Sequence, residues 1–426
     1  MDNEGEKKMT QFPSGFLWGA ATSAHQIEGG NTKNDWYRWE TDPKRIARLK
    51  AEGKNPDDYI SGSACDFRHR YREDIKRAAE ELHTNAFRFS IEWSRVEPEE
   101  GRWDETEIAY YRDVVKTCRE FGIEPIVTLW HWTLPLWASQ KGGWLWRGVT
   151  ARWLQYVERM VRELGNDVKI WITINEPTVY VGYGCLAGEA PPGFRNPWKA
   201  IETMYALSYA HAEAYELIHH MSPRKDVQVG IAAGLQWITP WSHNIINDVA
   251  AFIRRFFAMR WFFMLAKKKQ DFVGVNYYRH FQIRVNPKLP RWGLFWHEPV
   301  ERQSDMGWEL VPEGLYHVCR WAWKKFRKPI YITEYGLADE TDTWRAWYLA
   351  EGVRQAARLR ADGVDLRGFL VWSLIDNFEM PPPMSFWPKF GLQTRERVWR
   401  SSARVWAEIA RTNGAFVADE RRHDAE

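Results

Sequence analysis

Short apolar runs rich in β-branched residues alternate with amphipathic stretches along the chain, and this alternation constrains the fold more than any other feature. Eight runs are expected to form strands: Leu17–Thr22, Ala86–Ile91, Pro125–Leu129, Lys169–Ile174, Val227–Ala233, Phe272–Asn276, Pro329–Thr333 and Gly368–Trp372. Because parallel strands are joined by crossovers that usually contain a helix, this alternation indicates a parallel sheet. Eight such units predict an α/β fold with a single (β/α)8 TIM barrel.

Helical periodicity fills the intervals between these runs. The clearest stretches are Arg70–Leu82, Glu105–Phe121, Ala151–Leu164, Trp198–His220, Pro312–Lys325 and Trp344–Ala361. No Pro-, Gly- or Ser-rich linker divides the chain, so residues 1–426 are expected to form one domain. The polar residues at about 1–10 and 419–426 are expected to be tails.

The charge balance argues against two classes of partner. Lys and Arg number 59 and Asp and Glu 56, a net charge of +3 that indicates neither nucleic acid nor a membrane surface. The polar start lacks the apolar core of a signal peptide, and the most apolar stretch, around Trp261–Ala266, is far shorter than a membrane span. We therefore expect a soluble cytoplasmic protein.

Cysteine and tryptophan usage bear on the kind of site. Cys65, Cys118, Cys185 and Cys319 lie far apart and form no Cys-x-x-Cys pair, so neither a zinc site nor a disulfide framework is indicated. No metal or other cofactor is expected. Tryptophan is unusually frequent, at 27 residues. Aromatic faces stack on the apolar faces of sugars, so this excess fits a carbohydrate site, although most of these rings must belong to the core.

Two glutamates stand at the C-terminal ends of apolar runs. Glu176 ends Trp-Ile-Thr-Ile-Asn-Glu, and Glu334 ends Tyr-Ile-Thr-Glu. A parallel barrel places its chemistry at this end of its strands. Singly, each glutamate is more simply a solvated charge or a helix-capping partner. Because they follow different strands, however, they can face one another across a pocket, and two facing carboxyl groups are the minimal equipment for cleaving a glycosidic bond.

Further polar and aromatic residues lie at the ends of the same runs. They are Arg88, Glu92, His131, Trp132, Asn175, Asn276, Tyr278, Trp372 and Glu379. Any one of them is equally well explained as a partner for loop backbone. Their placement at one end of one barrel is the informative observation, because it predicts a single pocket.

With these residues placed, the chain closely resembles glycoside hydrolase family 1, the retaining β-glycosidases such as β-glucosidases and β-galactosidases. The resemblance runs from about Phe12 to Trp406. The segments that carry it are Phe16–Ser23, Ala64–Phe67, Phe87–Arg95, Thr128–Pro135, Asp271–Tyr278, Met306–Leu310 and Trp372–Glu379, together with the two glutamate motifs. It implies hydrolysis of β-glycosidic bonds at the non-reducing end by double displacement, without a cofactor.

The resemblance also implies catalytic roles. Glu176 corresponds to the general acid/base and Glu334 to the nucleophile. Arg88 corresponds to a buried arginine whose charge keeps the nucleophile ionised, and Tyr278 to a hydrogen-bond donor to the same carboxylate. Asn175 corresponds to the residue that contacts the sugar 2-hydroxyl.

A second set of positions is implied to bind the substrate, a small β-glycoside or oligosaccharide. These positions are Gln26, His131, Trp132, Asn276, Trp308, Trp372 and Glu379.

Three features depart from the family pattern. Tyr335 follows the nucleophile where the family usually has asparagine, and we expect its bulk to alter packing there. Met380 replaces a tryptophan, so an indole N–H donor to the sugar is lost. The segment between Trp237 and Asp271 is short, which predicts a wider pocket mouth and poorly formed outer subsites.

Two other functions stay open at the level of sequence. A 6-phospho-β-glycosidase is disfavoured because Glu379 would repel a phosphate and Lys389 alone lacks the partners of a phosphate site. A sugar-binding protein with weak or lost catalysis is compatible with the same barrel, although such a protein needs neither glutamate. The sequence gives no preference among glucosides, galactosides and fucosides, no aglycone and no oligomeric state.

Overall fold

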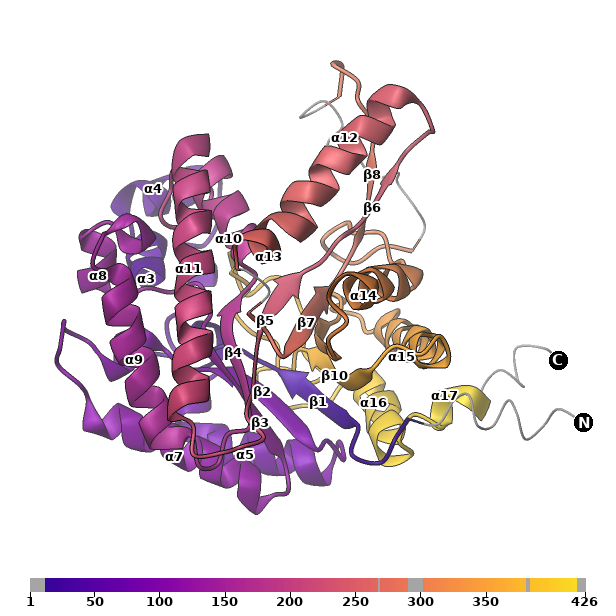
Figure 1. The fold of residues 1–426 in the computed structure, drawn as a ribbon, viewed down its shortest axis with the longest axis horizontal. Coiled ribbons are helices and arrows are strands. Elements are labelled where there is room, and N and C mark those ends of the chain that lie inside the picture. The colour runs from indigo at the N-terminus through magenta and orange to yellow at the C-terminus, as the bar shows by residue number, and fades with distance from the viewer. Residues whose placement is uncertain (1–11, 267–268, 290–301, 381–383, 420–426) are drawn as a thin grey trace, which may run out of the picture.

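The computed structural model describes residues 12–266, 269–289, 302–380 and 384–419. Eight parallel strands close into a barrel in the order β1-β10-β9-β7-β5-β4-β3-β2 (Figure 1). The strands are β1 (Leu17–Ala21), β2 (Ala86–Ser90), β3 (Glu124–Trp130), β4 (Ile170–Asn175), β5 (Gln228–Gly234), β7 (Phe272–Tyr277), β9 (Ile330–Tyr335) and β10 (Leu366–Trp372). The predicted (β/α)8 barrel is confirmed, and each predicted strand overlaps one of these eight.

Helices surround the barrel (Figure 1). The six predicted helices correspond to α5 (Phe67–Glu80), α7 (Glu105–Glu120), α9 (Val149–Leu164), α11 (Pro197–Met221), α14 (Glu313–Phe326) and α15 (Arg345–Ala361). The eighth strand is followed by α16 (Ser401–Arg411) and α17 (Phe416–Asp419). Loops carry α2 (Ala24–Ile27), α3 (Asp35–Glu40), α4 (Pro43–Ala51), α6 (Trp93–Val96), α8 (Leu136–Gln140) and α10 (Pro177–Val181). Most of these were missed because four to six residues are too few to show a period.

The strand register aligns polar residues at the C-terminal end of the barrel. Ala21 of β1 pairs with Arg88 of β2 on one side and with Trp372 of β10 on the other. Asn276 of β7 pairs with Glu334 of β9. Residues that pair across parallel strands lie at the same level of the sheet, so this register brings the ends of distant segments together.

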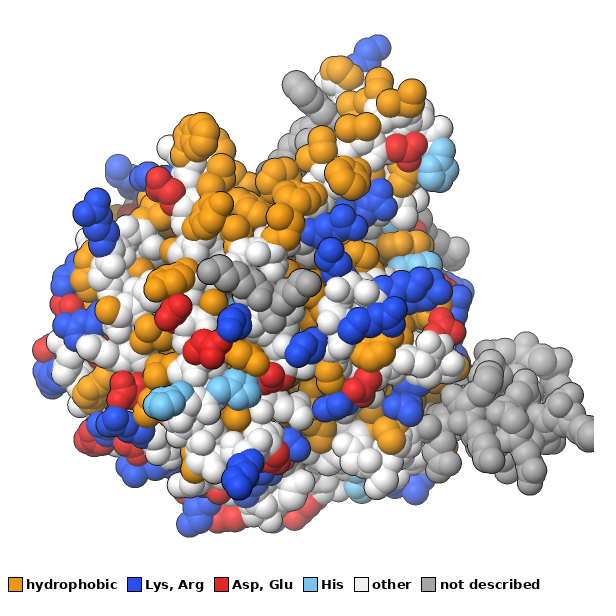
Figure 2. Space-filling model, viewed as in Figure 1, with side chains coloured by type: hydrophobic (Ala, Val, Ile, Leu, Met, Phe, Trp, Pro, Cys, Tyr) orange, Lys and Arg blue, Asp and Glu red, His pale blue; other side chains and the backbone are white. Residues whose placement is uncertain are grey.

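The segment between β5 and β7 forms a projection beside α11 (Figure 1). It contains β6 (Trp237–Pro240), α12 (Ile245–Arg255), a π-helical turn (Phe256–Arg260) and α13 (Trp261–Leu265), and β6 pairs with β8 (His280–Ile283). One face of α12 is apolar but exposed; it carries Ile245, Ile246, Val249, Phe252 and Ile253. Figure 2 shows apolar side chains gathered over this projection and the neighbouring helix. Whether the segment widens the pocket mouth stays a prediction.

Three further expectations concern the chain as a whole. The four cysteines are buried and unpaired. Within the described ranges, no helix is long and apolar enough to cross a membrane. The predicted tails lie outside the described residues except for Asp419, which ends α17. The expectation of one domain over residues 1–426 stays a prediction.

Candidate active site

A pocket opens at the C-terminal ends of the strands, and most of the predicted site residues line it. Its wall contains eleven of them: Gln26, His131, Trp132, Asn175, Glu176, Asn276, Tyr278, Trp308, Glu334, Trp372 and Glu379. Arg88 is fully buried and contacts Glu334 instead of lining the pocket. These residues therefore meet in one place, as expected from their positions at strand ends. The expectation was wrong for Glu92, which does not line the pocket because its buried carboxylate accepts hydrogen bonds from the hydroxyls of Ser94 and Thr133.

Glu334, at the end of β9, is held by two donors. Nη1 of Arg88 lies 2.5 Å from its Oε1, and the hydroxyl of Tyr278 donates to its Oε2 at 2.6 Å. Burial raises the pKa of the Glu334 carboxyl, whereas the charge of Arg88 and the hydrogen bond from Tyr278 oppose that rise. Both donors stabilise the ionised form of this carboxyl.

Glu176 follows β4 in a left-handed backbone conformation, with φ of 46°, and α10 begins at the next residue, Pro177. The side-chain amide of Asn276 donates to its Oε1 at 2.9 Å. Burial, and then the charge of Glu334, raise the pKa of Glu176 to about 8. In contrast to Glu334, this carboxyl forms no direct ion pair with any described residue, so its proton is retained at neutral pH.

A polar network under the pocket connects these groups. Nη2 of Arg88 donates to Oδ1 of Asn175 at 2.7 Å, and the Asn175 amide nitrogen lies 3.2 Å from Nε2 of His131. Burial, followed by the charge of Arg88, lowers the pKa of His131 well below its ordinary value, so the imidazole is neutral. The network fixes the orientation of the Asn175 amide in the pocket wall.

A second group of polar side chains lies at the end of β10. The indole nitrogen of Trp372 donates to Oε1 of Glu379 at 3.1 Å, and the Trp372 ring stacks on His131. The amide nitrogen of Gln26 donates to Oδ1 of Asn377 and to the carbonyl oxygen of Phe378, each at 2.8 Å. Burial raises the pKa of Glu379 to about 8, so this carboxyl can donate as well as accept hydrogen bonds.

The two aromatic residues Trp132 and Trp308 are held differently. Trp132 has φ of 76°, stacks on Trp36, and donates from its indole nitrogen to the carbonyl oxygen of Asn175 at 3.0 Å. Trp308 packs edge-on against Tyr278, with 6.2 Å between ring centroids. Trp132 is thus tied to the strand end below, whereas Trp308 shapes the wall.

The departures at Tyr335 and Met380 have different structural consequences. Tyr335 does not line the pocket: its ring stacks on Tyr348 of α15, with centroids 4.5 Å apart, and its hydroxyl donates to the Tyr348 carbonyl. Consecutive strand residues point to opposite sides of the sheet, so Tyr335 points outward where Glu334 points inward. Met380 is 1% exposed and does line the pocket, whereas residues 381–383 lie outside the described ranges.

Several wall residues were missed by the sequence argument. They are Val179, Tyr183, Gly234, Leu235, Gln236, Arg279, Met306, Phe390 and Met380, the last of which was noted only as a departure. Arg279 directly follows Tyr278, so its position just past a strand end was an available signal. Gly234 ends β5, and Val179 and Tyr183 lie on the helical segment that follows Glu176. The rest lie on loops whose path the sequence does not specify. Among the described residues, no group of three His, Cys, Asp or Glu side chains could hold a metal ion.

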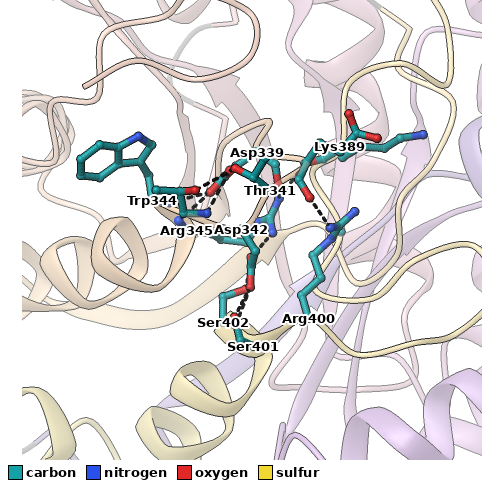
Figure 3. Close-up of polar contacts among 12 residues, drawn as sticks. Asp339, Thr341, Asp342, Trp344, Arg345, Lys389, Arg400, Ser401 and Ser402 are labelled. Atoms are coloured by element: carbon teal, nitrogen blue, oxygen red, sulfur yellow. Dashed lines mark hydrogen bonds and ion pairs between the residues drawn. The ribbon is translucent and has the colours of Figure 1, made fainter. Parts of the chain in front are cut away.

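A buried ionic cluster lies beside the pocket and connects the loops that follow β9 and β10 (Figure 3). We call Asp339, Asp342, Arg345, Asp376 and Arg400 the loop network. Arg345 pairs with Asp342 and donates to the carbonyl oxygens of residues 339 and 389, at 2.6 and 2.7 Å. Arg400 pairs with Asp376 at 2.6 Å. Asp376 is three residues from Glu379, so the network braces the loop that carries Glu379.

Known proteins identify the family. The model of glycosyl hydrolase family 1 matches residues 8–268 and 263–415. The chain belongs to this family. β-Glucosidase A of Thermotoga maritima is 32% identical, over 95% of this chain and 98% of that protein. A β-galactosidase of Pyrococcus woesei is 29% identical, over 95% of this chain and 98% of that protein.

Solved structures that resemble this chain share its fold and are β-glycosidases. The β-glycosidase from Pyrococcus horikoshii has a TM-score of 0.85 at 36% identity, covering 95% of this chain and 96% of that one. The β-glucosidase from Thermotoga maritima in complex with glucoimidazole has a TM-score of 0.86 at 29% identity, covering 95% and 100%. Retaining hydrolysis is general in family 1, and the protein is a β-glycosidase of this kind.

Proposed function

We propose that Glu334 and Glu176 carry out a double displacement at the anomeric carbon of β-glucosides, β-galactosides or β-fucosides. Glu334 attacks the anomeric carbon, and Glu176 protonates the leaving oxygen. The observation that carries this assignment is the difference between their surroundings. Arg88 and Tyr278 stabilise the Glu334 carboxylate, whereas burial and the charge of Glu334 keep Glu176 protonated.

The same arrangement supports the second step. Once Glu334 forms an ester with the sugar, its negative charge is gone, and the pKa of Glu176 falls because one of the two causes of its rise is removed. Glu176 then accepts a proton from the water that attacks the glycosyl-enzyme. Asn276 bonds Glu176 through its amide nitrogen and stays available in both protonation states.

The remaining wall residues form the sugar site in this proposal. Glu379, Trp372 and Gln26 contribute hydroxyl-binding groups and an aromatic face at one end of the pocket. Asn175 contacts the 2-hydroxyl, and its orientation by Arg88 and His131 supports that role. His131 binds as a neutral imidazole.

One assay tests this function. Purified protein is supplied with chromogenic β-glucoside, β-galactoside, β-fucoside, β-mannoside and 6-phospho-β-glucoside, and the first anomer released is read by NMR. We expect turnover of at least one neutral β-glycoside with a β-configured first product. An α-configured first product would overturn the double displacement, and turnover of only the 6-phospho substrate would establish the phosphoglycosidase alternative. Sugar binding without any turnover would establish the binding-protein alternative.

We also propose a cytoplasmic location. Four buried, unpaired cysteines are typical of proteins kept in a reducing compartment. Fractionation of cells that express the protein, with antibody detection in the cytosolic and exported fractions, tests this. Detection mainly outside the cytosol would contradict it.

A further inference from the structure

Arg279 is a charged residue in the pocket wall that none of the roles above uses. It lies between the end of β7 and the start of β8. Its guanidinium carbon is 4.7 Å from the ring centre of Trp308 and 4.2 Å from that of Phe281. The side chain therefore makes cation–π contacts with two aromatic rings and also lines the pocket.

The position of Arg279 is on the leaving-group side of the pocket. Glu176 delivers its proton to the leaving oxygen, so the leaving group lies beside Glu176. Gly234 touches Glu176 so closely that a Cβ there would lie 2.9 Å from Oε1, and Leu235 and Gln236 continue the same wall. Tyr183, whose hydroxyl interacts with Arg279, lies in the π-helical segment Gly182–Ala187. This segment follows α10, the helix that begins directly after Glu176.

The charge of Arg279 is not neutralised by a carboxylate among the described residues. Besides the two aromatic rings, the hydroxyl of Tyr183 is the group that stabilises its charge there, and burial lowers the pKa of Arg279 from its ordinary value. A second guanidinium, that of Arg254, adds positive charge nearby. Arg254 donates to Gln236 at 2.9 Å, and burial, followed by the charge of Arg279, lowers the pKa of Arg254. A buried cation without a counter-ion is costly, and an anionic ligand offsets that cost.

We propose that Arg279 recognises a carboxylate on the leaving group, so that the enzyme prefers β-glycosides with an acidic aglycone. The proposal rests on the proposed role of Glu176, which defines the leaving-group side. In this proposal the guanidinium of Arg279 binds the carboxylate, and the rest of the leaving group lies along the wall formed by Gly234, Leu235 and Gln236. The negative charge of Glu334 repels an anion from the opposite, sugar-binding side, so the preference applies to the aglycone alone.

The competing explanation is structural. Stacking on Trp308 and Phe281 is itself favourable for a guanidinium, and Arg279 could simply complete the wall. In that case an uncharged aglycone of the same shape would bind as well as a charged one. Binding of two matched ligands therefore separates the two explanations.

The decisive experiment measures binding without hydrolysis. Calorimetry compares 4-carboxyphenyl and 4-carbamoylphenyl 1-thio-β-glucosides, whose sulfur linkage resists cleavage. We expect the carboxylate to bind roughly tenfold more tightly, as for a hydrogen bond to a charged partner. Arg279→Met should bring the two dissociation constants together, and Arg279→Lys should keep part of the difference. Equal constants in the natural protein would overturn the proposal, even if the protein hydrolysed no glycoside.

A matched control removes a guanidinium that also lies over an aromatic ring but is outside the pocket. The guanidinium carbon of Arg284 lies 4.0 Å from the ring centre of Trp241, and Arg284 is not part of the pocket wall. Arg284→Met should leave the preference intact. Loss of the preference in this variant to the same extent as in Arg279→Met would overturn the assignment to Arg279.

Hydrolysis then identifies the kind of acid. The ratio of kcat/KM for 4-carboxyphenyl over 4-carbamoylphenyl β-glucoside is compared with the ratio for β-glucosyl-1,4-glucuronic acid over cellobiose. Each ratio for the natural protein is divided by the same ratio for Arg279→Met, because this cancels the difference in leaving-group ability between the two substrates of a pair. A change of about tenfold in either pair supports the proposal and shows whether the acid is aromatic or a sugar acid. No change in both overturns it, and turnover of neutral 4-nitrophenyl β-glucoside in the same preparation reports separately on the proposed function.

Discussion

Two groups of buried carboxyl groups lie at the same end of the barrel and differ in how their charge is balanced. In the pocket, Glu176 and Glu379 have pKa values raised to about 8, first by burial. In the loop network, burial of Asp342 is outweighed by hydrogen bonds from Ser402 and Ser401 and by the charge of Arg345, so its pKa is lowered (Figure 3). Burial alone therefore does not set the protonation state.

The two regions differ in how many arginines pair directly with their carboxylates, and this explains the difference in pKa. Arg88 is the guanidinium that pairs directly with a pocket carboxylate, and it is committed to Glu334. The loop network instead matches Asp342 with Arg345 and Asp376 with Arg400. We infer that Glu176 and Glu379 keep their protons at neutral pH because no guanidinium pairs with them among the described residues, whereas the paired charges give the loops a fixed shape.

The largest expected effect comes from removing a pocket carboxylate. Glu334→Gln should lower kcat/KM at least about 10⁴-fold, because the nucleophile is gone. With Glu334→Ala, azide should restore turnover and give the α-glycosyl azide. The matched change in the loop network, Asp342→Asn, should lower the melting temperature and spare kcat/KM. The reverse outcome would break the comparison.

The second prediction concerns the proton on Glu176. Because its pKa is about 8 and the protonated form is active, kcat/KM should fall as the pH rises through about 8. Glu176→Ala should abolish that basic limb. It should still form the glycosyl-enzyme from a dinitrophenyl glycoside, and azide should then give the β-azide. An unchanged basic limb in the variant, or a β-azide from the Glu334 variant together with an α-azide from the Glu176 variant, would show that the roles are misassigned.

The third prediction compares the two arginines. Arg88→Met removes the charge that opposes the rise in the Glu334 pKa, so the acidic limb of kcat/KM should move to higher pH and the rate should fall roughly 10²- to 10³-fold. Arg345→Met should lower the free energy of unfolding by about 3–5 kcal/mol, because it leaves Asp342 buried without its partner.

Denaturant unfolding and pH–rate profiles of both variants test this comparison. The folded fraction of Arg345→Met should keep the acidic limb of the natural protein. A shifted limb in Arg345→Met, or an unshifted one in Arg88→Met, would contradict the division between the two regions.

The smallest expected effect is at Met380, which lines the pocket where the family has a tryptophan donor. If the missing indole N–H weakens sugar binding, Met380→Trp should raise kcat/KM on an aryl β-glucoside roughly two- to tenfold, the value of one neutral hydrogen bond. Met380→Phe, which adds a ring without a donor, is the control. Equal gains in both variants would assign the effect to ring size instead.

The barrel and the pocket could be predicted from the sequence because both follow from the alternation of apolar runs and helical patterns along the chain. The end of each strand can be predicted from the end of an apolar run, and a parallel barrel brings all C-terminal strand ends to one face. Glu176 and Glu334 could therefore be placed in one pocket although they lie far apart in the sequence. The loop network was not predicted, because its members come from irregular loops whose contacts depend on the final packing. Arg345 is an example: it opens α15 like any basic helical residue, yet it is 1% exposed.

The projection was also beyond sequence reasoning, for a different reason. Periodicity detects an apolar helix face, but it assigns that face to the core. In α12 the apolar side chains of Ile245, Val249 and Phe252 are exposed, so the usual inference from pattern to burial is wrong there. The expectation that Tyr335 disturbs the nucleophile's surroundings was likewise wrong about direction, because alternation along β9 turns that side chain away from the pocket.

The packing of Tyr335 constrains the order in which this chain could have changed during descent. A Cβ at Gly352 would lie 2.5 Å from the Tyr335 ring, so no larger residue can occupy position 352 while tyrosine stands at 335. A lineage with asparagine at 335 could carry alanine at 352, but it had to acquire glycine there before, or together with, the tyrosine. The two positions therefore depend on each other sterically: replacing Tyr335 alone with a smaller residue leaves a void, and enlarging Gly352 alone produces a clash.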